Sequence, residues 1–412
     1  MQAFTYRSGQ LCAEDVAVQD LARQYGTPLY VYSRGHLREQ YRALAAAMAE
    51  VAPLICYSVK ANSNAAVIRT LVDEGAGLDI VSGGELYRAL HAGADAANIV
   101  FAGVGKTREE IEYALREQIL FFTVESEPEV QRISDCARHL GLTGRVAFRV
   151  NPDVDPQTHK YISTGKKENK FGLDPARAVR AYALAAALPN IEIAGLHMHI
   201  GSQILTAQPY GAALAKVRDL CLELKRAHRT FRYLDIGGGL GIEYKPDQPP
   251  LDFAVFAAAV LPHIRELGLR VVMEPGRCLV GNAGLLVCRV QYVKESYKKF
   301  IVVDAAMNDL IRPPLYQAYH EVVAVQTGDA PPRVYDVVGP VCESSDVLAQ
   351  GRSLRAREGD LLAILSAGAY AFVMASNYNS RPRAPEVMIA GATMREVRAR
   401  ETFDTLVAGE SL

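Results

Sequence analysis

Between residue 54 and about residue 275, short apolar runs rich in β-branched residues alternate with longer amphipathic segments. Runs of this length are typical of buried strands, and the segments between them repeat apolar residues with a helical period. Their alternation predicts parallel strands joined by crossover helices, and eight strands are the number that closes a TIM-type (β/α)8 barrel. An open doubly wound sheet remains the alternative. The predicted strands are 54–60, 77–82, 98–103, 120–126, 145–150, 191–200, 232–239 and 270–276, and four of the predicted helices are 64–75, 83–93, 107–118 and 127–141.

After about residue 280 strand-like runs follow one another with turns between them and little helix. This pattern predicts a second, mostly antiparallel β domain. We therefore expect a barrel over residues 26–280 and a β domain made of residues 1–25 and 281–412. Residues 151–172 form a long polar connection, which is more often functional than idle inside a compact domain. The strand-like runs of the second domain are 285–296, 298–305, 321–326, 333–340, 360–368 and 386–391, with 4–18 as candidates to join them.

Composition narrows the class of protein. A chain of 412 residues, half of them hydrophobic and 22% charged, is typical of a globular protein with two domains. The net charge of −1 gives no electrostatic support for binding nucleic acid or an anionic membrane. The longest uncharged run, 361–376, is too short to span a membrane, and the first fifteen residues show no signal-peptide pattern. Seven cysteines without CxxC spacing suit reduced thiols, so we expect a cytoplasmic protein without disulfides.

Polar residues gather where the predicted strands end, which is the face that carries the chemistry in barrels of this kind. Lys60 at the end of an apolar run could be a lysine with its amine in solvent or a desolvated nucleophile for carbonyls. "HMH" at 197–199 could suggest a metal, but no third ligand stands at metal-site spacing, and "GGGLG" could be a tight turn only. Together the rim supplies a lysine, an imidazole, a carboxylate, an arginine and glycine-flanked backbone donors, which a pyridoxal phosphate site needs. The strand-end residues are Lys60, Asp79, Ser82, Arg149, His199, Gly201, Ser202, Gly237–Gly239, Glu274, Gly276 and Arg277.

Several longer motifs resemble those of one family. The chain is similar to the fold-type III pyridoxal-phosphate-dependent decarboxylases, and among them to the bacterial diaminopimelate decarboxylases, over nearly its whole length. The resemblance implies an alanine-racemase-like (β/α)8 barrel followed by a β domain, in agreement with the strand count. It also implies decarboxylation of meso-2,6-diaminopimelate to L-lysine, the last step of lysine biosynthesis. The motifs, in chain order, are "YSVKANSN", "DIVSGGEL", "HMHIGSQ", "DIGGGLG", "EPGR", "GPVCESSD" and "SAGAYAFVMASNYNSRPR".

The resemblance also assigns roles to residues of the cofactor site. Lys60 would hold pyridoxal 5'-phosphate as an internal aldimine, so that its amine is not buried as a charge. Glu274 would face the pyridine nitrogen and keep it protonated, and His199 would stack on the ring. The other cofactor-binding candidates are Asp79, Ser202, Gly238, Gly239, Gly276, Arg277 and Tyr370.

Substrate recognition is assigned by the same resemblance. The far end of diaminopimelate carries a second carboxylate and a second ammonium group. Cys342 corresponds to the residue that returns a proton to the α-carbon. In relatives this Cys-Glu segment reaches the neighbouring subunit's site, which implies a homodimer, and the 151–172 connection would be a lid. The substrate-binding candidates are Arg277, Arg312 and Tyr316 for the carboxylate, Glu343 for the ammonium group, and Tyr370.

Three rival functions stay open at this point. A decarboxylase of another basic amino acid, of the ornithine or arginine type, would need acidic groups where Arg312 stands. A racemase on the same barrel would place an arginine, and not Glu274, against the pyridine nitrogen. A non-enzymatic pyridoxal phosphate carrier built on the lone barrel would not need the second domain with Cys342, Glu343 and Tyr370.

Overall fold

The computed structural model of the chain describes residues 3–155, 171–328 and 331–411, and it divides them into two compact units. One unit consists of residues 41–242 and 250–278, and the other of residues 1–40, 243–249 and 279–412. All but the two ends of the predicted lid lies outside the described residues. Within the part of the chain that is described, no helix is both long enough and apolar enough to cross a membrane.

The first unit is a closed barrel of eight parallel strands in the order β10-β11-β12-β5-β6-β7-β8-β9. All eight predicted strands form, so the barrel prediction is confirmed and the open sheet is excluded. The strands are β5 (Leu54–Ser58), β6 (Gly77–Ile80), β7 (Ile99–Phe101), β8 (Phe121–Val124), β9 (Gly144–Arg149), β10 (Ile191–His197), β11 (Tyr233–Asp235) and β12 (Arg270–Met273).

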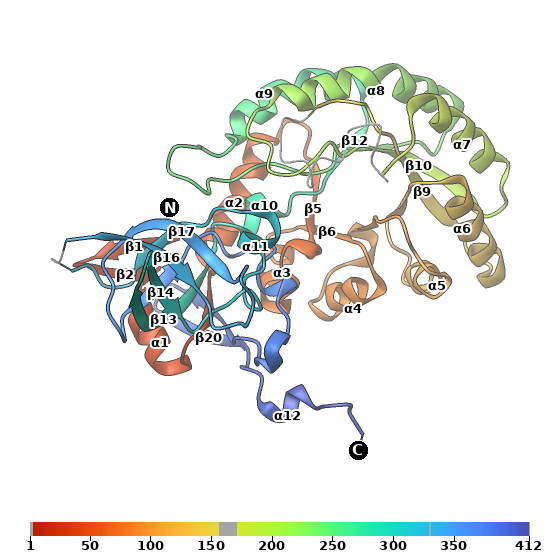
Figure 1. Ribbon diagram of the computed structural model, residues 1–412. Helices are drawn as coiled ribbons and strands as arrows, with labels where there is room; N and C mark the ends of the chain where they lie inside the picture. The colour runs from red at the N-terminus through yellow and green to blue at the C-terminus, as the bar shows by residue number, and fades with distance from the viewer. Residues whose placement is uncertain (1–2, 156–170, 329–330, 412) are drawn as a thin grey trace. The chain divides into compact units, whose positions relative to one another are not determined.

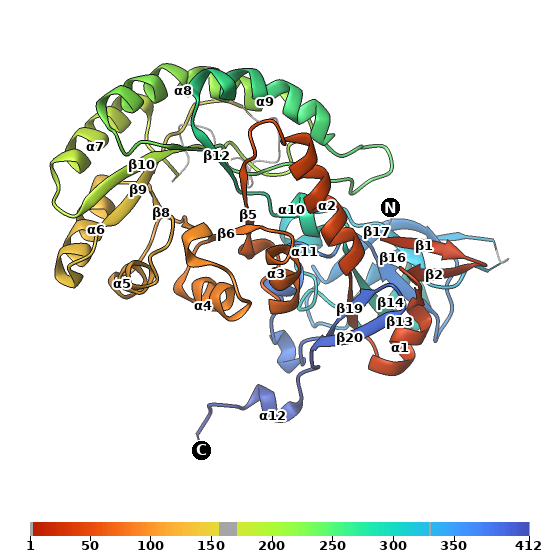
Figure 2. The same ribbon diagram turned by 180° about the vertical axis from the view of Figure 1, so that it is seen from behind.

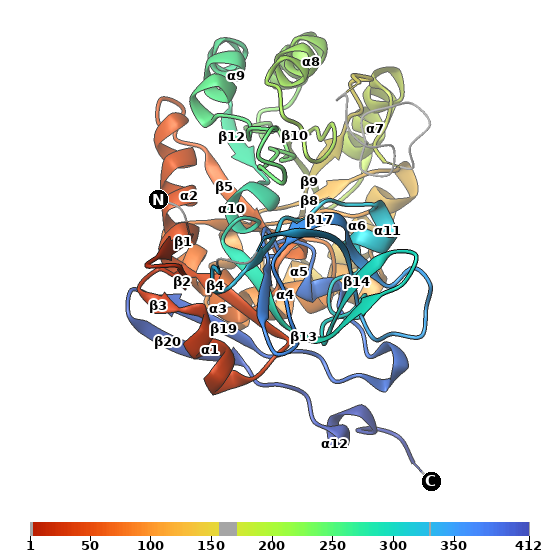
Figure 3. The same cartoon turned by 60° about the vertical axis from the view of Figure 1, so that its left-hand side comes forward.

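Helices surround these strands. In Figures 1 and 2 α3 to α9 lie outside the barrel, and Figure 3 shows α7, α8 and α9 next to one another outside β9, β10 and β12. Polar caps start several helices directly after the strand-end loops: Asn64, Ser82 and Ser126 each accept a backbone N–H of the first helical turn. The helices are α2 (Arg34–Ala47), which enters the unit, α3 (Ala65–Val72), α4 (Gly83–His91), α5 (Arg108–Arg116), α6 (Glu127–Leu140), α7 (Pro175–Ala187), α8 (Gln208–Ala227) and α9 (Phe253–Leu267).

The second unit is built on a nine-stranded sheet. Its main path is β17-β16-β14-β13-β4-β19-β20, with β18 paired to β13 and β15. Most pairs are antiparallel, as predicted, while β14–β16 and β19–β4 are parallel. The strands are β4 (Leu29–Ser33), β13 (Gly284–Glu295), β14 (Lys299–Val303), β15 (Val322–Ala324), β16 (Arg333–Val338), β17 (Val347–Leu354), β18 (Leu361–Ile364), β19 (Glu386–Ala390) and β20 (Thr393–Arg398).

A small three-stranded sheet of β1 (Phe4–Arg7), β2 (Gln10–Ala13) and β3 (Val16–Ala17) precedes α1 (Val18–Tyr25). Apolar side chains of these elements share one core with β4, β13 and β19. Strand β4 lies within the range predicted for the barrel, but it pairs with β13 and β19 of the second unit. All five of its residues are buried, as expected of a strand with a neighbour on each side. The remaining helices are α10 (Arg277–Val280), α11 (Arg312–Tyr316) and α12 (Phe403–Leu406).

Candidate active site

Lys60 lies in the one-turn 3-10 helix Val59–Ala61 that follows β5. Its Nζ is 2.6 Å from Oδ2 of Asp79, which is fully buried at the end of β6, while the lysine side chain is 41% exposed. Ser58 donates its hydroxyl proton to the same carboxylate oxygen at 2.7 Å. The structure therefore shows an ion-paired amine at the barrel mouth, not a desolvated one.

Glu274 lies beyond β12 and is buried. Its Oε2 is 3.0 Å from Nε2 of His197, and its Oε1 is buried without a hydrogen-bond partner among the described residues. Burial would raise the pKa of Glu274, but the charge and hydrogen bond of His197, together with Lys60, hold the pKa well below its usual range. The barrel thus contains an ionised carboxylate with one oxygen available as an acceptor.

His199 and the glycine-rich loop after β11 are joined by a backbone hydrogen bond. The N–H of Gly238 donates to Nδ1 of His199 at 3.2 Å. Burial, and next the charge of Arg149, hold the pKa of His199 well below its usual value. The ring is therefore neutral, with its proton on Nε2.

The neighbouring backbone has no room for side chains. A Cβ added to Gly238 would lie 2.0 Å from the carbonyl oxygen of Glu274, and Gly239 has a φ of +97°. Close by in sequence, Arg277 donates from Nη2 to the hydroxyl of Ser202 at 3.0 Å. Gly276, between Glu274 and Arg277, is also buried. A guanidinium, a hydroxyl and glycine backbone amides are the kinds of donor that phosphate sites use.

Arg312 is held rigidly in the second unit. It is 7% exposed, it donates from Nη1 to Nε2 of His320 at 2.7 Å, and its guanidinium lies over the ring of Tyr244 at 4.7 Å. His320 is fully buried, and its Nδ1 donates to the carbonyl oxygen of Leu365 at 2.8 Å. Because one nitrogen donates, the other must accept from Arg312. Tyr316, in the same helix α11, is half-buried.

Cys342 and Glu343 lie on the loop between β16 and β17. The backbone N–H of Cys342 donates to Oδ1 of Asn379 at 2.8 Å, and Tyr378 donates its hydroxyl proton to Glu343 at 2.9 Å. The buried carboxylate of Asp346 accepts the N–H of Val341 at 2.8 Å and so fixes the start of the loop. Cys342 is exposed and the other six cysteines are buried; all seven are free thiols.

Tyr370 follows β18 in a turn. Its φ is +55°, a left-handed conformation that costs energy for a residue other than glycine. The structure therefore brings Lys60, Asp79, Glu274, His199 and Gly238 into one network, and it joins Arg277 to Ser202. The predicted residues of the second unit lie on three separate segments, at 312–316, 342–343 and 370.

Two residues of the barrel network were missed by the sequence analysis, His197 and Asp235. The inference that "HMH" lacks further ligands was wrong, because Asp235 and Glu274 lie with His197 so that one ligand atom of each is within 4.8 Å of the others. Strand pairing brings these distant residues together, which sequence spacing does not reveal. Burial first, and then the charge of Glu274, raise the pKa of Asp235 well above its usual value, which favours the neutral carboxyl group, a poorer metal ligand than a carboxylate. The alternation of His197 and His199 within the predicted strand 191–200 was the available signal.

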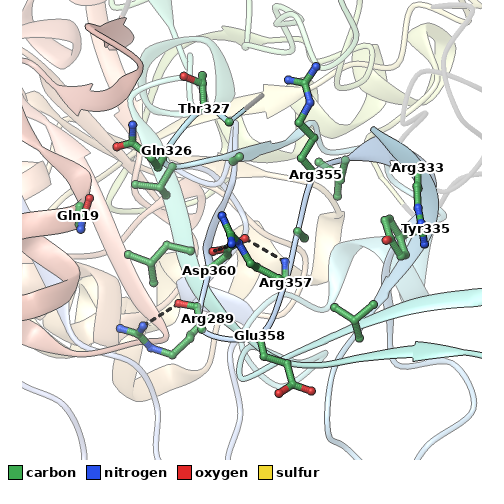
Figure 4. A pocket seen from close by; sticks show the side chains of 18 of the residues that line it. Gln19, Arg289, Gln326, Thr327, Arg333, Tyr335, Arg355, Arg357, Glu358 and Asp360 are labelled. Carbon is green, nitrogen blue, oxygen red and sulfur yellow. Dashed lines mark hydrogen bonds and ion pairs between the residues drawn. The ribbon is translucent and has the colours of Figure 1, made fainter. Parts of the chain in front are cut away.

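A separate pocket of about 1100 Å³ lies in the second unit (Figure 4). Five arginines line it, but Arg333 is paired with Glu295 at 2.8 Å and Arg289 donates to the carbonyl oxygen of Gly359 at 3.0 Å. None of the predicted site residues lines it.

Comparison with known proteins agrees with this geometry. Residues 34–281 match the family "Pyridoxal-dependent decarboxylase, pyridoxal binding domain". The chain is 51% identical to diaminopimelate decarboxylase of Pseudomonas aeruginosa, covering 100% of this chain and 99% of that protein.

Two solved diaminopimelate decarboxylases, both with L-lysine, are also similar in structure. That of Helicobacter pylori has a TM-score of 0.91 and 39% identity, covering 95% of this chain and 98% of that one. That of M. jannaschii has a TM-score of 0.95 and 36% identity, covering 100% and 98%. The chain therefore belongs to the diaminopimelate decarboxylase family of pyridoxal-dependent decarboxylases.

Proposed function

We propose that this protein is a lyase that releases CO2 from meso-2,6-diaminopimelate to give L-lysine with pyridoxal 5'-phosphate as cofactor. The observation that carries the proposal is the pairing of Lys60 with Asp79 at the mouth of a barrel whose interior holds the ionised Glu274. An amine for a carbonyl cofactor and an acceptor for its ring nitrogen are the two groups that this chemistry requires.

The residues of the barrel fit the cofactor. Pyridoxal phosphate, when bound, supplies a carbonyl that condenses with amines and a ring that accepts electrons from the bond being broken. Lys60 would attach it covalently, with Asp79 holding the amine in place. Oε1 of Glu274 would accept the ring N–H, which accounts for a buried oxygen that otherwise lacks a partner within the described residues. Neutral His199 would lie against the ring face.

The phosphate group would bind at the glycine-rich loops. Arg277 and Ser202 offer charged and neutral donors that already contact each other, and a backbone without side chains lets amides approach the phosphate. The phosphate-binding candidates are Ser202, Gly238, Gly239, Gly276 and Arg277.

Residues of the second unit would select the substrate. Arg312 is buried and oriented by two neighbours, so it can hold the distal carboxylate with little loss of side-chain entropy. Tyr316 of the same unit and Arg277 of the barrel unit would assist it. Glu343 would bind the distal ammonium group, and Tyr370 would contact cofactor and substrate. The thiol of Cys342, exposed on its loop, would deliver the proton to the α-carbon after CO2 leaves.

The first test compares substrates. Purified protein loaded with pyridoxal phosphate is expected to release CO2 from meso-diaminopimelate and to form lysine, and to leave ornithine and arginine unchanged. Release from ornithine in preference would favour the other decarboxylase type. Lys60→Ala should lose the link to the cofactor that borohydride would reduce to a stable secondary amine; peptide mass analysis that places the reduced pyridoxyl group on another lysine would contradict the assignment.

The second test concerns assembly. We propose a homodimer in which each subunit gives Cys342 and Glu343 to its partner's site, a symmetric exchange that a two-fold axis allows. Lys60→Ala and Cys342→Ala, each inactive alone, should then restore activity when mixed under subunit exchange. Random pairing makes about half of the dimers mixed with one intact site each, so recovery should approach about a quarter of wild type. No recovery, with exchange shown by native mass spectrometry, would mean that each site uses one chain.

A further inference from the structure

His197 has no role in the function proposed above, yet it occupies the centre of the barrel network. It is the last residue of β10 and is 1% exposed. Its Nε2 lies 3.0 Å from Oε2 of Glu274. A carboxylate oxygen can only accept, and therefore Nε2 must carry the proton and donate it.

The hydrogen bond fixes the orientation of a carboxylate that has few other restraints. Among the described residues, Oε1 of Glu274 has no hydrogen-bond partner, so the hydrogen bond from His197 and the neighbouring carboxyl group of Asp235 together decide where this oxygen points. Both residues are held by strand geometry: β10 and β12 flank β11, and the backbone N–H of Glu274 donates to the carbonyl oxygen of Gly237 at 2.8 Å. Strand backbones and a hydrogen bond of ordinary length hold both residues in place, as a site of this kind requires.

The charges nearby give His197 a second effect. Three carboxyl groups, Asp79, Asp235 and Glu274, are buried at this level of the barrel. Asp79 is paired with Lys60, and burial raises the pKa of Asp235, as described above. Glu274 keeps its charge because of His197 first, and of Lys60 after it. Loss of His197 would leave a buried carboxylate with its main stabilising neighbour removed, and such a group takes up a proton.

We propose that His197 is a positioning residue for the cofactor: by donating Nε2–H to Glu274, it aims Oε1 at the ring nitrogen and keeps that nitrogen protonated. The inference rests on the proposed placement of the ring nitrogen at Glu274. Its consequence is specific, because a ring that loses its proton is a weaker electron acceptor while substrate binding residues are untouched.

The test uses the holoenzyme loaded with ring-15N pyridoxal phosphate. Solid-state 15N NMR reports the protonation of the ring nitrogen directly, and steady-state kinetics report kcat and KM. In His197→Leu the resonance should move toward that of an unprotonated pyridine, and kcat should fall at least about tenfold while KM changes by less than about threefold. His197→Gln keeps an N–H donor and should restore the protonated resonance and much of kcat.

Matched variants decide between the possible outcomes. His139→Gln, on the exposed face of α6, controls for loss of a histidine and should match wild type. Thermal melting of each protein without cofactor shows whether it folds; His197→Met replaces the leucine variant if that one does not. A folded variant without the donor that keeps a protonated ring nitrogen and wild-type kcat would overturn the inference, and so would a glutamine variant as impaired as the apolar ones. Glu274→Gln separates the inference about His197 from the proposed function on which it rests. If this variant also leaves the 15N resonance of the ring nitrogen unchanged, the placement of that nitrogen at Glu274 is itself wrong.

Discussion

Replacing His320 with leucine should weaken substrate binding, although His320 is not one of the proposed substrate contacts and acts through Arg312. Leucine removes the acceptor of Arg312 Nη1 and the donor to the carbonyl oxygen of Leu365, bonds of 2.7 and 2.8 Å inside a fully buried site. An unsatisfied buried group costs about 1–3 kcal/mol, so the free energy of unfolding should fall by about 2–5 kcal/mol. Arg312 keeps its contact with the ring of Tyr244, and therefore only part of its orientation is lost.

We expect KM for diaminopimelate to rise about tenfold to thirtyfold, which corresponds to ~1.4–2 kcal/mol, while kcat stays within about threefold. The assay is lysine formation over a range of substrate concentrations at a temperature where the variant is folded. His320→Gln places an acceptor near the former Nε2 and should recover about half of the lost binding energy, in keeping with a single regained hydrogen bond. His139→Leu, at an exposed position, is the control.

An unchanged KM in folded His320→Leu would refute this reasoning, because Arg312 would then need no support from His320. Equal losses in the leucine and glutamine variants would also refute it, since the acceptor would then be irrelevant. Arg312→Ala should be the more severe change, with a loss of about 2–5 kcal/mol in transition-state binding and cofactor uptake preserved.

Three further predictions concern stability and cofactor binding. Burial raises the pKa of Asp309 to about 7, so the folded protein keeps a proton that the unfolded chain loses above its usual pKa, and the free energy of unfolding should fall as pH rises from about 4 to 7. Asp309→Asn should flatten this pH dependence and raise the free energy of unfolding by about 2–4 kcal/mol at pH 8. Urea unfolding at several pH values measures both. Lys106→Met leaves the buried carboxylate of Glu129, now 2.7 Å from the lysine Nζ, without its charge partner and should cost about 3–5 kcal/mol, and adding Glu129→Gln should reduce that loss. Gly238→Ala should abolish cofactor uptake because its Cβ would lie 2.0 Å from a carbonyl oxygen, whereas Gly105→Ala, with nothing within 4 Å, should bind cofactor as wild type does.

The barrel could be predicted from sequence because its signal is local. Each strand is a short apolar run, and each strand end is marked by a polar residue, so Lys60, Asp79 and Glu274 were found by position alone. Strand β17 was missed because its sequence "VLAQGRSL" contains a glycine and alternates poorly, with exposed residues in its middle. Strand β4 was not predicted, and its residues were placed within the barrel range, since its partners lie more than two hundred residues away.

The site, like the fold, was predictable where the signal is local and not where it depends on residues far apart in the sequence. Side chains that act at a strand end were visible, but the hydrogen-bond network between strands was not. His197 and Asp235 look like ordinary strand residues until β10, β11 and β12 are aligned. His320 lies outside any strand or helix and is identified only by its contact with Arg312.

The pairing of β4 has a consequence for how the chain is made on the ribosome. All eight barrel strands, between residues 54 and 273, leave the exit tunnel before β13 and β19. Strand β4 emerges ahead of them and waits for β13 and then for β19, which is translated last of its partners. During that interval "LYVYS", an apolar segment with two open edges, is exposed in the crowded cell, where such segments are sites of non-native pairing. A nascent chain halted before residue 386 would therefore hold all eight barrel strands and a sheet in which one edge of β4 still lacks its partner β19.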